Sequence, residues 1–259
     1  MKDAIVQVEI RDRIGFITLN RPEKRNALNA EMVQAIDQAL TLCEEEAEAK
    51  VIVLRAAGKA FCSGADLASL QQMQTNTYEE NLADSALLKA LFERIYTYPK
   101  VIIAAVQGHA LAGGCGLAAV CDFSFAVPEA LFGYTEVRIG FVPAIVMVFL
   151  VKKIGEGAAR KLLLGAELID AHAAQAVGMI GEVVPAEELM ERVESFAQLL
   201  ISQNSGTAMA LTKKMLAEVQ HLPIGEALQH AAEVNAHARG TEDCKKGIAA
   251  FLAKEKPLW

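Results

Sequence analysis

Short segments rich in β-branched residues alternate with longer amphipathic segments along most of the chain, and this alternation limits the possible folds. The strand-like segments are residues 5–10, 14–19, 51–54, 101–106, 122–126 and 181–184. One helix is expected from the N-cap Asn29 to about Glu48. Another is expected from Tyr78 to Tyr96, because Pro99 disfavours helix in the residues before it. Strands that alternate with helices predict the α/β class.

The chain is expected to divide into two parts. From about residue 187 it reads as helical throughout, with breaks near residues 204–206, Pro223 and Gly240. These helices are amphipathic, and such helices can form an interface between copies of one chain. We therefore expect a core with the functional site over residues 1–195 and a helical oligomerisation region over residues 196–259.

Two stretches of the chain resemble each other. Residues 51–64 align without gaps on residues 101–114, and each reads as a buried strand, a glycine and a loop of small residues. The match suggests two stacked turns that bring tight backbone beside the same space. It has a plainer explanation, since buried strands often end at glycine, and two units are too few to predict a solenoid.

The loops of these two stretches carry a chemical signal. In residues 104–122 a buried strand leads through small residues into a helix that begins near Gly113, where free amides carry partial positive charge. Residues 58–67 again place unpaired amides after a strand. Two amides aimed at one oxygen form an oxyanion hole, although a tight crossover packed on a neighbour would give the same pattern.

Composition excludes several classes of function. The chain has 259 residues, 53% of them hydrophobic, and a net charge of −7, so no basic surface is expected to attract nucleic acid. Five cysteines without CxxC or Cys/His spacing predict a reducing compartment and no metal site. The longest apolar stretch, residues 141–151, is too short to span a bilayer and contains Pro143. We expect a cytoplasmic protein that does not bind membranes.

Taken together, the motifs resemble those of the enoyl-CoA hydratase/isomerase (crotonase) superfamily, from about residue 5 to Lys254. They are residues 20–22, 26–29, 58–67, 104–122 and 132–140. The resemblance implies an α/β spiral of repeated ββα units with a C-terminal trimerisation region, assembled as a homotrimer or a homohexamer (a dimer of trimers). It implies an acyl-CoA substrate, with coenzyme A as its handle and no further cofactor or metal.

The resemblance also implies roles for individual residues. The amides of Ala65 and Gly113 match the family's oxyanion hole around the thioester carbonyl. Further positions match those that contact coenzyme A: Lys24 and Arg25 at its phosphates and adenine, backbone of Ala27, Ala60, Asp66 and Leu67 along it, and Phe251 and Lys254 across a subunit boundary.

The carboxylates depart from the usual hydratase pattern. Hydratases of this family usually carry two glutamates, which orient a water, deprotonate it and pass a proton to the α-carbon. The second is present here as Glu136, but Gly116 occupies the position of the first. We expect the space beside Gly116 to be open and to hold a water molecule or a substrate branch.

Three functions remain open from the sequence. A hydratase or dehydratase of a branched acid is favoured, because residues 135–144 resemble bacterial 3-methylglutaconyl-CoA hydratases and polyketide β-branching dehydratases. A Δ3,Δ2-enoyl-CoA isomerase needs only one base, which Glu136 supplies. A non-catalytic acyl-CoA-binding relative is the third. Ala144 excludes the dehalogenases of the superfamily, which place a nucleophilic aspartate there.

Overall fold

The computed structural model describes residues 4–259, so residues 1–3 of the expected core lie outside the described part. Its larger sheet has six strands in the order β1 (Val6–Arg11), β2 (Ile14–Leu19), β3 (Val51–Ala56), β5 (Val101–Val106), β7 (Phe123–Ala126) and β10 (Glu182–Val183). β1 and β2 are antiparallel, and the remaining neighbours are parallel. The parallel strands are buried hydrophobic runs, as expected for a sheet covered on both faces.

A second, smaller sheet was not predicted. Its order is β4 (Ala60–Cys62), β6 (His109–Leu111), β8 (Leu131–Gly133) and β9 (Ile169–Asp170). The first three strands run parallel, and β9 is antiparallel to β8. After each of β3, β5 and β7 the chain crosses from the larger sheet to the smaller one, which gives the repeated ββα units of the expected spiral. The segment over residues 58–67, which is expected from the sequence to be a loop, therefore contains β4.

The internal sequence match is a structural match. β3 pairs with β5 in the register Val51↔Val101, so the offset of the sequence alignment is the offset of the strand pairing. The following strands slip slightly, because Ala60 pairs with His109 and Cys62 with Ala110 across an irregularity. The repeated segments are thus two stacked turns of the same spiral.

The helices over the sheets follow local sequence signals. α1 (Ala30–Glu45) starts where Asn29 Oδ1 accepts a hydrogen bond from the Met32 amide, and it ends three residues before the expected Glu48. α3 (Tyr78–Thr97) starts at a capping box formed by Thr77 and Glu80. The other elements before residue 189 are η1 (Pro22–Lys24), α2 (Leu67–Met73), α4 (Gly113–Val120), η2 (Glu136–Ile139), α5 (Ala144–Gly165) and α6 (Ala171–Ala176).

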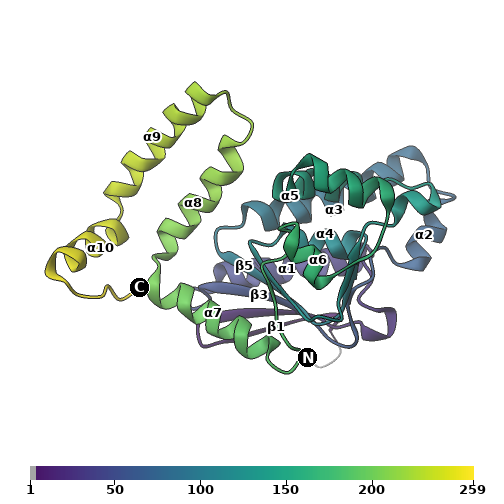
Figure 1. The fold of residues 1–259 in the computed structure, drawn as a ribbon, viewed down its shortest axis with the longest axis horizontal. Helices are drawn as coiled ribbons and strands as arrows, with labels where there is room; N and C mark the ends of the chain where they lie inside the picture. The colour runs from purple at the N-terminus through teal and green to yellow at the C-terminus, as the bar shows by residue number, and fades with distance from the viewer. Residues whose placement is uncertain (1–3) are drawn as a thin grey trace.

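The C-terminal helices separate from the core later than expected. The predicted boundary at residues 195 and 196 falls inside α7 (Leu189–Gln203), which buries Val193 and Ala197 in one continuous core. α8 (Gly206–Val219), α9 (Ile224–Gly240) and α10 (Glu242–Ala253) then extend away from the sheets (Figure 1). We therefore propose a boundary near Ser205, which caps α8. None of the helices over residues 4–259 combines the length and hydropathy needed to cross a membrane.

Candidate active site

The predicted catalytic residues follow three neighbouring parallel strands. Ala65 comes three residues after β4, Gly113 two residues after β6, and Glu136 three residues after β8. The carboxyl ends of parallel strands lie at one edge of a sheet, where open α/β sheets bind ligands. The order β4-β6-β8 thus brings two amide groups and one carboxylate to the same edge, from parts of the sequence far apart.

The Ala65 loop (residues 63–66) and the Gly113 loop (residues 112–114) approach each other closely at two glycines. A Cβ placed on Gly64 would lie 2.8 Å from the Ala112 Cβ and 3.6 Å from the Gly113 nitrogen. A Cβ placed on Gly114 would lie 2.2 Å from the Cys62 carbonyl oxygen. Only glycine permits these approaches, so the small residues noted in the sequence let the two backbones meet.

Both proposed donor amides are free for a ligand. A parallel bridge between Leu28 and Ala65 uses the Gly64 carbonyl and the Asp66 amide on its two sides, which leaves the Ala65 N–H directed elsewhere. Gly113 is the first residue of α4, so its N–H has no partner within the helix. Over residues 4–259 neither N–H has a protein acceptor.

The residue before Gly113 has a strained backbone conformation and is hydrogen-bonded to strand β8. Ala112, the N-cap of α4, has φ 50° and ψ −124°, an uncommon conformation for a residue other than glycine. Its own N–H donates to the Gly133 carbonyl at 2.7 Å. Gly133 is the last residue of β8, three positions before Glu136. This hydrogen bond ties the Gly113 amide to the segment that carries the carboxylate.

Glu136 opens the helical turn η2 and is half-buried. Its Oε2 atom is buried without a hydrogen-bond partner among the described residues. Burial raises the pKa of this carboxyl above its ordinary value, with its own backbone N–H acting in the opposite direction. A carboxyl with one uncommitted oxygen and a raised pKa suits the removal and return of a proton.

Tyr134 is a site neighbour that sequence reasoning missed. It is fully buried two residues before Glu136, and its hydroxyl lies against the Cys115 thiol without an oxygen or nitrogen partner in the described chain. Burial raises the pKa of Tyr134 well above its ordinary value, and the nearby Cys115 and Glu136 act in the same direction. The phenol therefore stays neutral. The sequence signal that could have identified Tyr134 was its position within the motif of residues 132–136, two residues before Glu136.

The turn over residues 21–26, which is expected to contact coenzyme A, is hydrogen-bonded to the segment that leads to Ala65. The side chain of Asn26 makes these bonds, and sequence reasoning missed this role. Its Nδ2 donates to the carbonyls of Ala57 and Ala60, both at 2.9 Å, and its Oδ1 accepts from the Arg21 amide. Lys24 and Arg25 lie in this turn and are exposed. Two cations are thus presented beside β4, as a phosphate contact requires.

The other residues expected along coenzyme A have different surroundings. Ala27 is buried, and the Ala60 carbonyl already accepts from Asn26 and from Gln107. Burial acts to raise the pKa of Asp66, but hydrogen bonds from the Ala68 amide and from Arg21 hold it below its ordinary value. Asp66 caps α2, and Leu67 beside it is 78% exposed. The structure thus gives Asp66 a structural role that the sequence did not indicate.

The expectation of open space beside Gly116 is wrong. A Cβ on Gly116 would lie 2.3 Å from Val146 Cγ1 and 3.1 Å from Phe92 Cε1, and both of these side chains are buried. α5 packs against α4 here and fills the volume that a side chain at position 116 would need. We therefore remove Gly116 from the residues expected to contact the substrate.

Phe251 and Lys254 are not brought to the site within this chain. Phe251 lies on α10 and is 80% exposed, and Lys254 is the C-cap of that helix. α10 and α2 lie at opposite ends of the molecule (Figure 1). A role for these two residues at coenzyme A therefore requires a second chain, as the prediction assumed.

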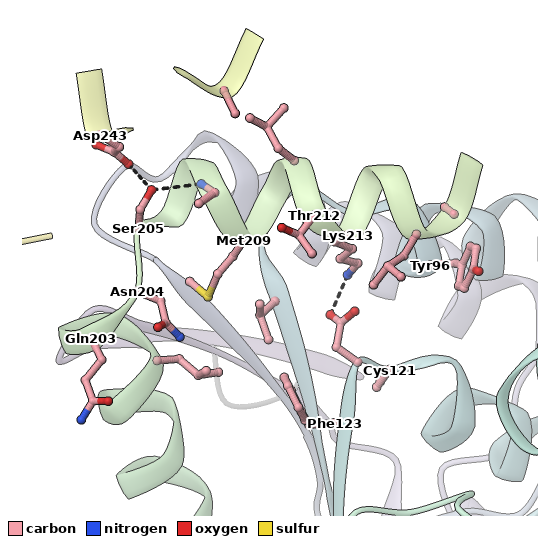
Figure 2. Close-up of a pocket in the computed structure, with 18 of the residues that line it drawn as sticks. Tyr96, Cys121, Phe123, Gln203, Asn204, Ser205, Met209, Thr212, Lys213 and Asp243 are labelled. Atoms are coloured by element: carbon pink, nitrogen blue, oxygen red, sulfur yellow. Dashed lines mark hydrogen bonds and ion pairs between the residues drawn. The ribbon is translucent and has the colours of Figure 1, made fainter. Parts of the chain in front are cut away.

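A cavity of about 890 Å³ lies away from the catalytic edge, where α8 and α10 approach the core (Figure 2). Its lining includes Tyr96, Met209 and Trp259, together with the ion pair of Lys213 and Asp122 at 2.7 Å. Ala65, Gly113 and Glu136 are not among the lining residues. Its size does not make it the active site, since it holds none of the groups that the chemistry needs.

The two thiols near the site are not poised as nucleophiles. Cys62 and Cys115 are buried, and burial raises the pKa of each to about 12, so neither is a thiolate near neutral pH. Over residues 4–259, no three histidine, cysteine or acidic side chains are placed to hold a metal ion. His109 accepts a hydrogen bond from the Leu131 amide through Nδ1, which links β6 to β8.

Comparison with known proteins gives one consistent result. The family model described as enoyl-CoA hydratase/isomerase matches residues 9–259. A Thermus thermophilus protein provisionally named as an enoyl-CoA hydratase is 42% identical over 253 residues, which are 98% of this chain and 99% of that protein. A crotonyl-CoA hydratase of Syntrophomonas wolfei is 33% identical over 251 residues, 96% of this chain and 95% of that protein. The crystal structure of an enoyl-CoA hydratase from Shewanella pealeana has a TM-score of 0.93 at 29% identity, covering 99% of this chain and 96% of that one.

Proposed function

Because the chain belongs to the enoyl-CoA hydratase/isomerase family and is an enzyme of acyl-CoA thioesters, we propose that it adds water to a 2-enoyl-CoA with Glu136 as its only acid–base residue. The reverse reaction, dehydration of a 3-hydroxyacyl-CoA, uses the same groups. The names of the relatives, which include a crotonyl-CoA hydratase and a short-chain-enoyl-CoA hydratase, support a short acyl chain.

One observation carries the proposal: the ends of β4, β6 and β8 present two unpaired amides and one partly buried carboxylate at a single edge. The Ala65 and Gly113 N–H groups would donate to the thioester oxygen and stabilise the enolate that forms there. Preorganised donors of this kind are commonly the largest single contribution to such catalysis.

The proposed reaction balances with one carboxylate. Glu136 takes a proton from water while the water oxygen bonds to the β-carbon, and the C=C electron pair moves onto the thioester oxygen as an enolate. Glu136 then returns its proton to the α-carbon, and the thioester carbonyl re-forms. One water molecule is added, and the enzyme is restored. One carboxylate can serve both the water at the β-carbon and the α-carbon only if both of its oxygens are available. The Oε2 atom of Glu136, which has no hydrogen-bond partner among the described residues, agrees with this requirement.

The test is hydration of crotonyl-CoA, followed as the loss of absorbance of the conjugated thioester. Wild type should turn over, and Glu136→Gln should lose about 10²–10⁴ in rate, as expected when a general acid–base is removed. Full turnover by Glu136→Gln would show that another group is the base. A panel that adds 3-methylglutaconyl-CoA tests the branched substrate that residues 135–144 indicate.

A second candidate is Δ3,Δ2-enoyl-CoA isomerase. Val146 and Phe92 close the side of the site where a second carboxylate would hold water, and proton movement between C2 and C4 needs no water. Isomerisation of a 3-enoyl-CoA, assayed with the same variant, decides between the two. An isomerase would form the conjugated thioester, whereas a hydratase would consume it.

We also propose that α8–α10 associate with other copies of the chain, as a trimer or a dimer of trimers. No hydrophobic residue of these three helices is buried in the part of the chain that the structure describes. Their exposed apolar residues include Leu216, Ile224, Leu228, Ile248, Phe251 and Leu252. Light scattering of the purified protein should give a mass of three or six chains, and a monomer would contradict the proposal.

A further inference from the structure

Position 116 has no room for a side chain, and the tightest contacts there come from one residue on the neighbouring helix. Gly116 lies in the first turn of α4, where its amide donates to the Ala112 carbonyl at 3.1 Å. A Cβ there would stand 2.3 Å from Val146 Cγ1 and 2.8 Å from Val146 Cβ, closer than Cβ atoms come in real proteins. Val146 is 4% exposed and lies in the first turn of α5, so it cannot turn away into solvent.

We infer that Val146 is a specificity-determining residue, which keeps this a one-carboxylate site by filling the volume that a glutamate at position 116 would need. The inference rests on the proposed function and adds a cause for its unusual chemistry. The glycine at 116 and the branched residue at 146 are one coupled feature, since each excludes a larger partner at the other position.

The position of these residues connects the packing to the chemistry. α4 begins with the Gly113 amide, and α5 begins eight residues after Glu136, so the contact between Gly116 and Val146 joins the two halves of the site. The second wall of this contact is Phe92, which is fully buried on α3. The result is an apolar wall, which leaves Glu136 to act on water alone.

A second carboxylate should therefore require two substitutions. In the double variant Gly116→Glu/Val146→Gly, the introduced carboxylate would accept a proton from water as the oxygen bonds to the β-carbon. The C=C electron pair would move into the enolate, and Glu136, already protonated, would give its proton to the α-carbon. The introduced carboxyl would then release its proton to solvent and Glu136 would take one up, which restores the enzyme for the next turnover. Alanine at 146 does not suffice, because the Val146 Cβ itself lies 2.8 Å from the position needed.

The experiment is a double-mutant cycle read by melting temperature and by crotonyl-CoA hydration. Gly116→Glu alone should lower Tm by more than 10 °C, and Val146→Gly alone should lower it less. The double variant should melt well above Gly116→Glu. Its hydration rate should exceed that of Val146→Gly at least tenfold, with a higher ratio of hydration to isomerisation of a 3-enoyl-CoA.

Two control variants make the same kinds of substitution at positions that are not crowded, so they separate the effect of the contact between positions 116 and 146 from the effect of the substitutions themselves. Gly157→Glu, at a position where a Cβ meets nothing within 4 Å, makes the same change in open space. Val148→Gly removes a 51% exposed valine from the same helix and reports the cost of glycine there. Both controls should keep wild-type hydration.

The inference is overturned if the Tm changes are additive, if the double variant melts no higher than Gly116→Glu, or if it hydrates no faster than Val146→Gly. Failure of the proposed function looks different, since wild type itself would then hydrate no 2-enoyl-CoA.

Discussion

Replacing Gly64 by alanine should damage the site and the fold by separable amounts. Gly64 has φ +87°, and the added methyl would lie 2.8 Å from the Ala112 Cβ and 3.1 Å from the Leu111 carbonyl oxygen. The left-handed backbone costs an alanine about 1–2 kcal/mol, and forcing a methyl into packed surroundings costs about 1–3 kcal/mol more. We expect Tm to fall by about 10 °C in a chain of this size.

The loss of activity should exceed what instability explains. The methyl would push apart the two loops that carry the Ala65 and Gly113 amides, and loss of one oxyanion donor costs about 10²–10³ in kcat. The assay is kcat for crotonyl-CoA hydration at a temperature where the variant is fully folded. Gly178→Ala is the control, because it has φ +78° with nothing within 4 Å of the added methyl. It should lose stability alone. A Gly64→Ala enzyme with kcat within twofold of wild type would refute the reasoning.

Three further predictions concern single side chains. Burial raises the pKa of the Glu136 carboxyl in the folded protein above its value in the unfolded chain. As pH rises from the unfolded pKa through the folded pKa, ionisation of Glu136 therefore lowers the stability of wild type, and the Tm of Glu136→Gln should rise relative to that of wild type. A Tm difference that stays constant over this pH interval would contradict the prediction. Asn26→Ala removes three hydrogen bonds of a fully buried amide and should cost about 2–4 kcal/mol in urea unfolding while raising KM for the acyl-CoA. Lys213→Ala leaves Asp122 with the Ile102 amide as its one remaining hydrogen-bond partner among residues 4–259 and should cost about 2 kcal/mol, less than a fully buried pair, because Asp122 is 22% exposed.

Much of the larger sheet could be predicted because its signals are local. Runs such as Val101–Val106 are long enough to show buried strands, and Asn29 marks the start of α1 through a cap that acts within one turn. The match of residues 51–64 with residues 101–114 even gave the register of β3 on β5. The smaller sheet escaped prediction because β4, β6 and β8 are three residues each, and no hydrophobic period is visible at that length.

The errors at the site came from contacts between distant parts of the chain. Glycine at 116 shows that no side chain is present, but only the fold shows that Val146 takes the space, thirty residues away in sequence. The burial of Tyr134 and the three hydrogen bonds of Asn26 are likewise set by tertiary packing. The boundary expected at residues 195 and 196 falls inside α7, because α7 is amphipathic like the helices after it, and periodicity does not tell which surface an amphipathic helix covers.

A crystal structure with a saturated acyl-CoA bound would test the central geometry most directly. We predict the thioester oxygen about 2.7–3.1 Å from both the Ala65 and the Gly113 nitrogens, the range of an oxyanion hole. The Glu136 carboxylate should stand beside the α- and β-carbons. A thioester oxygen bonded to neither amide, or a Glu136 side chain directed away from those carbons, would contradict the account.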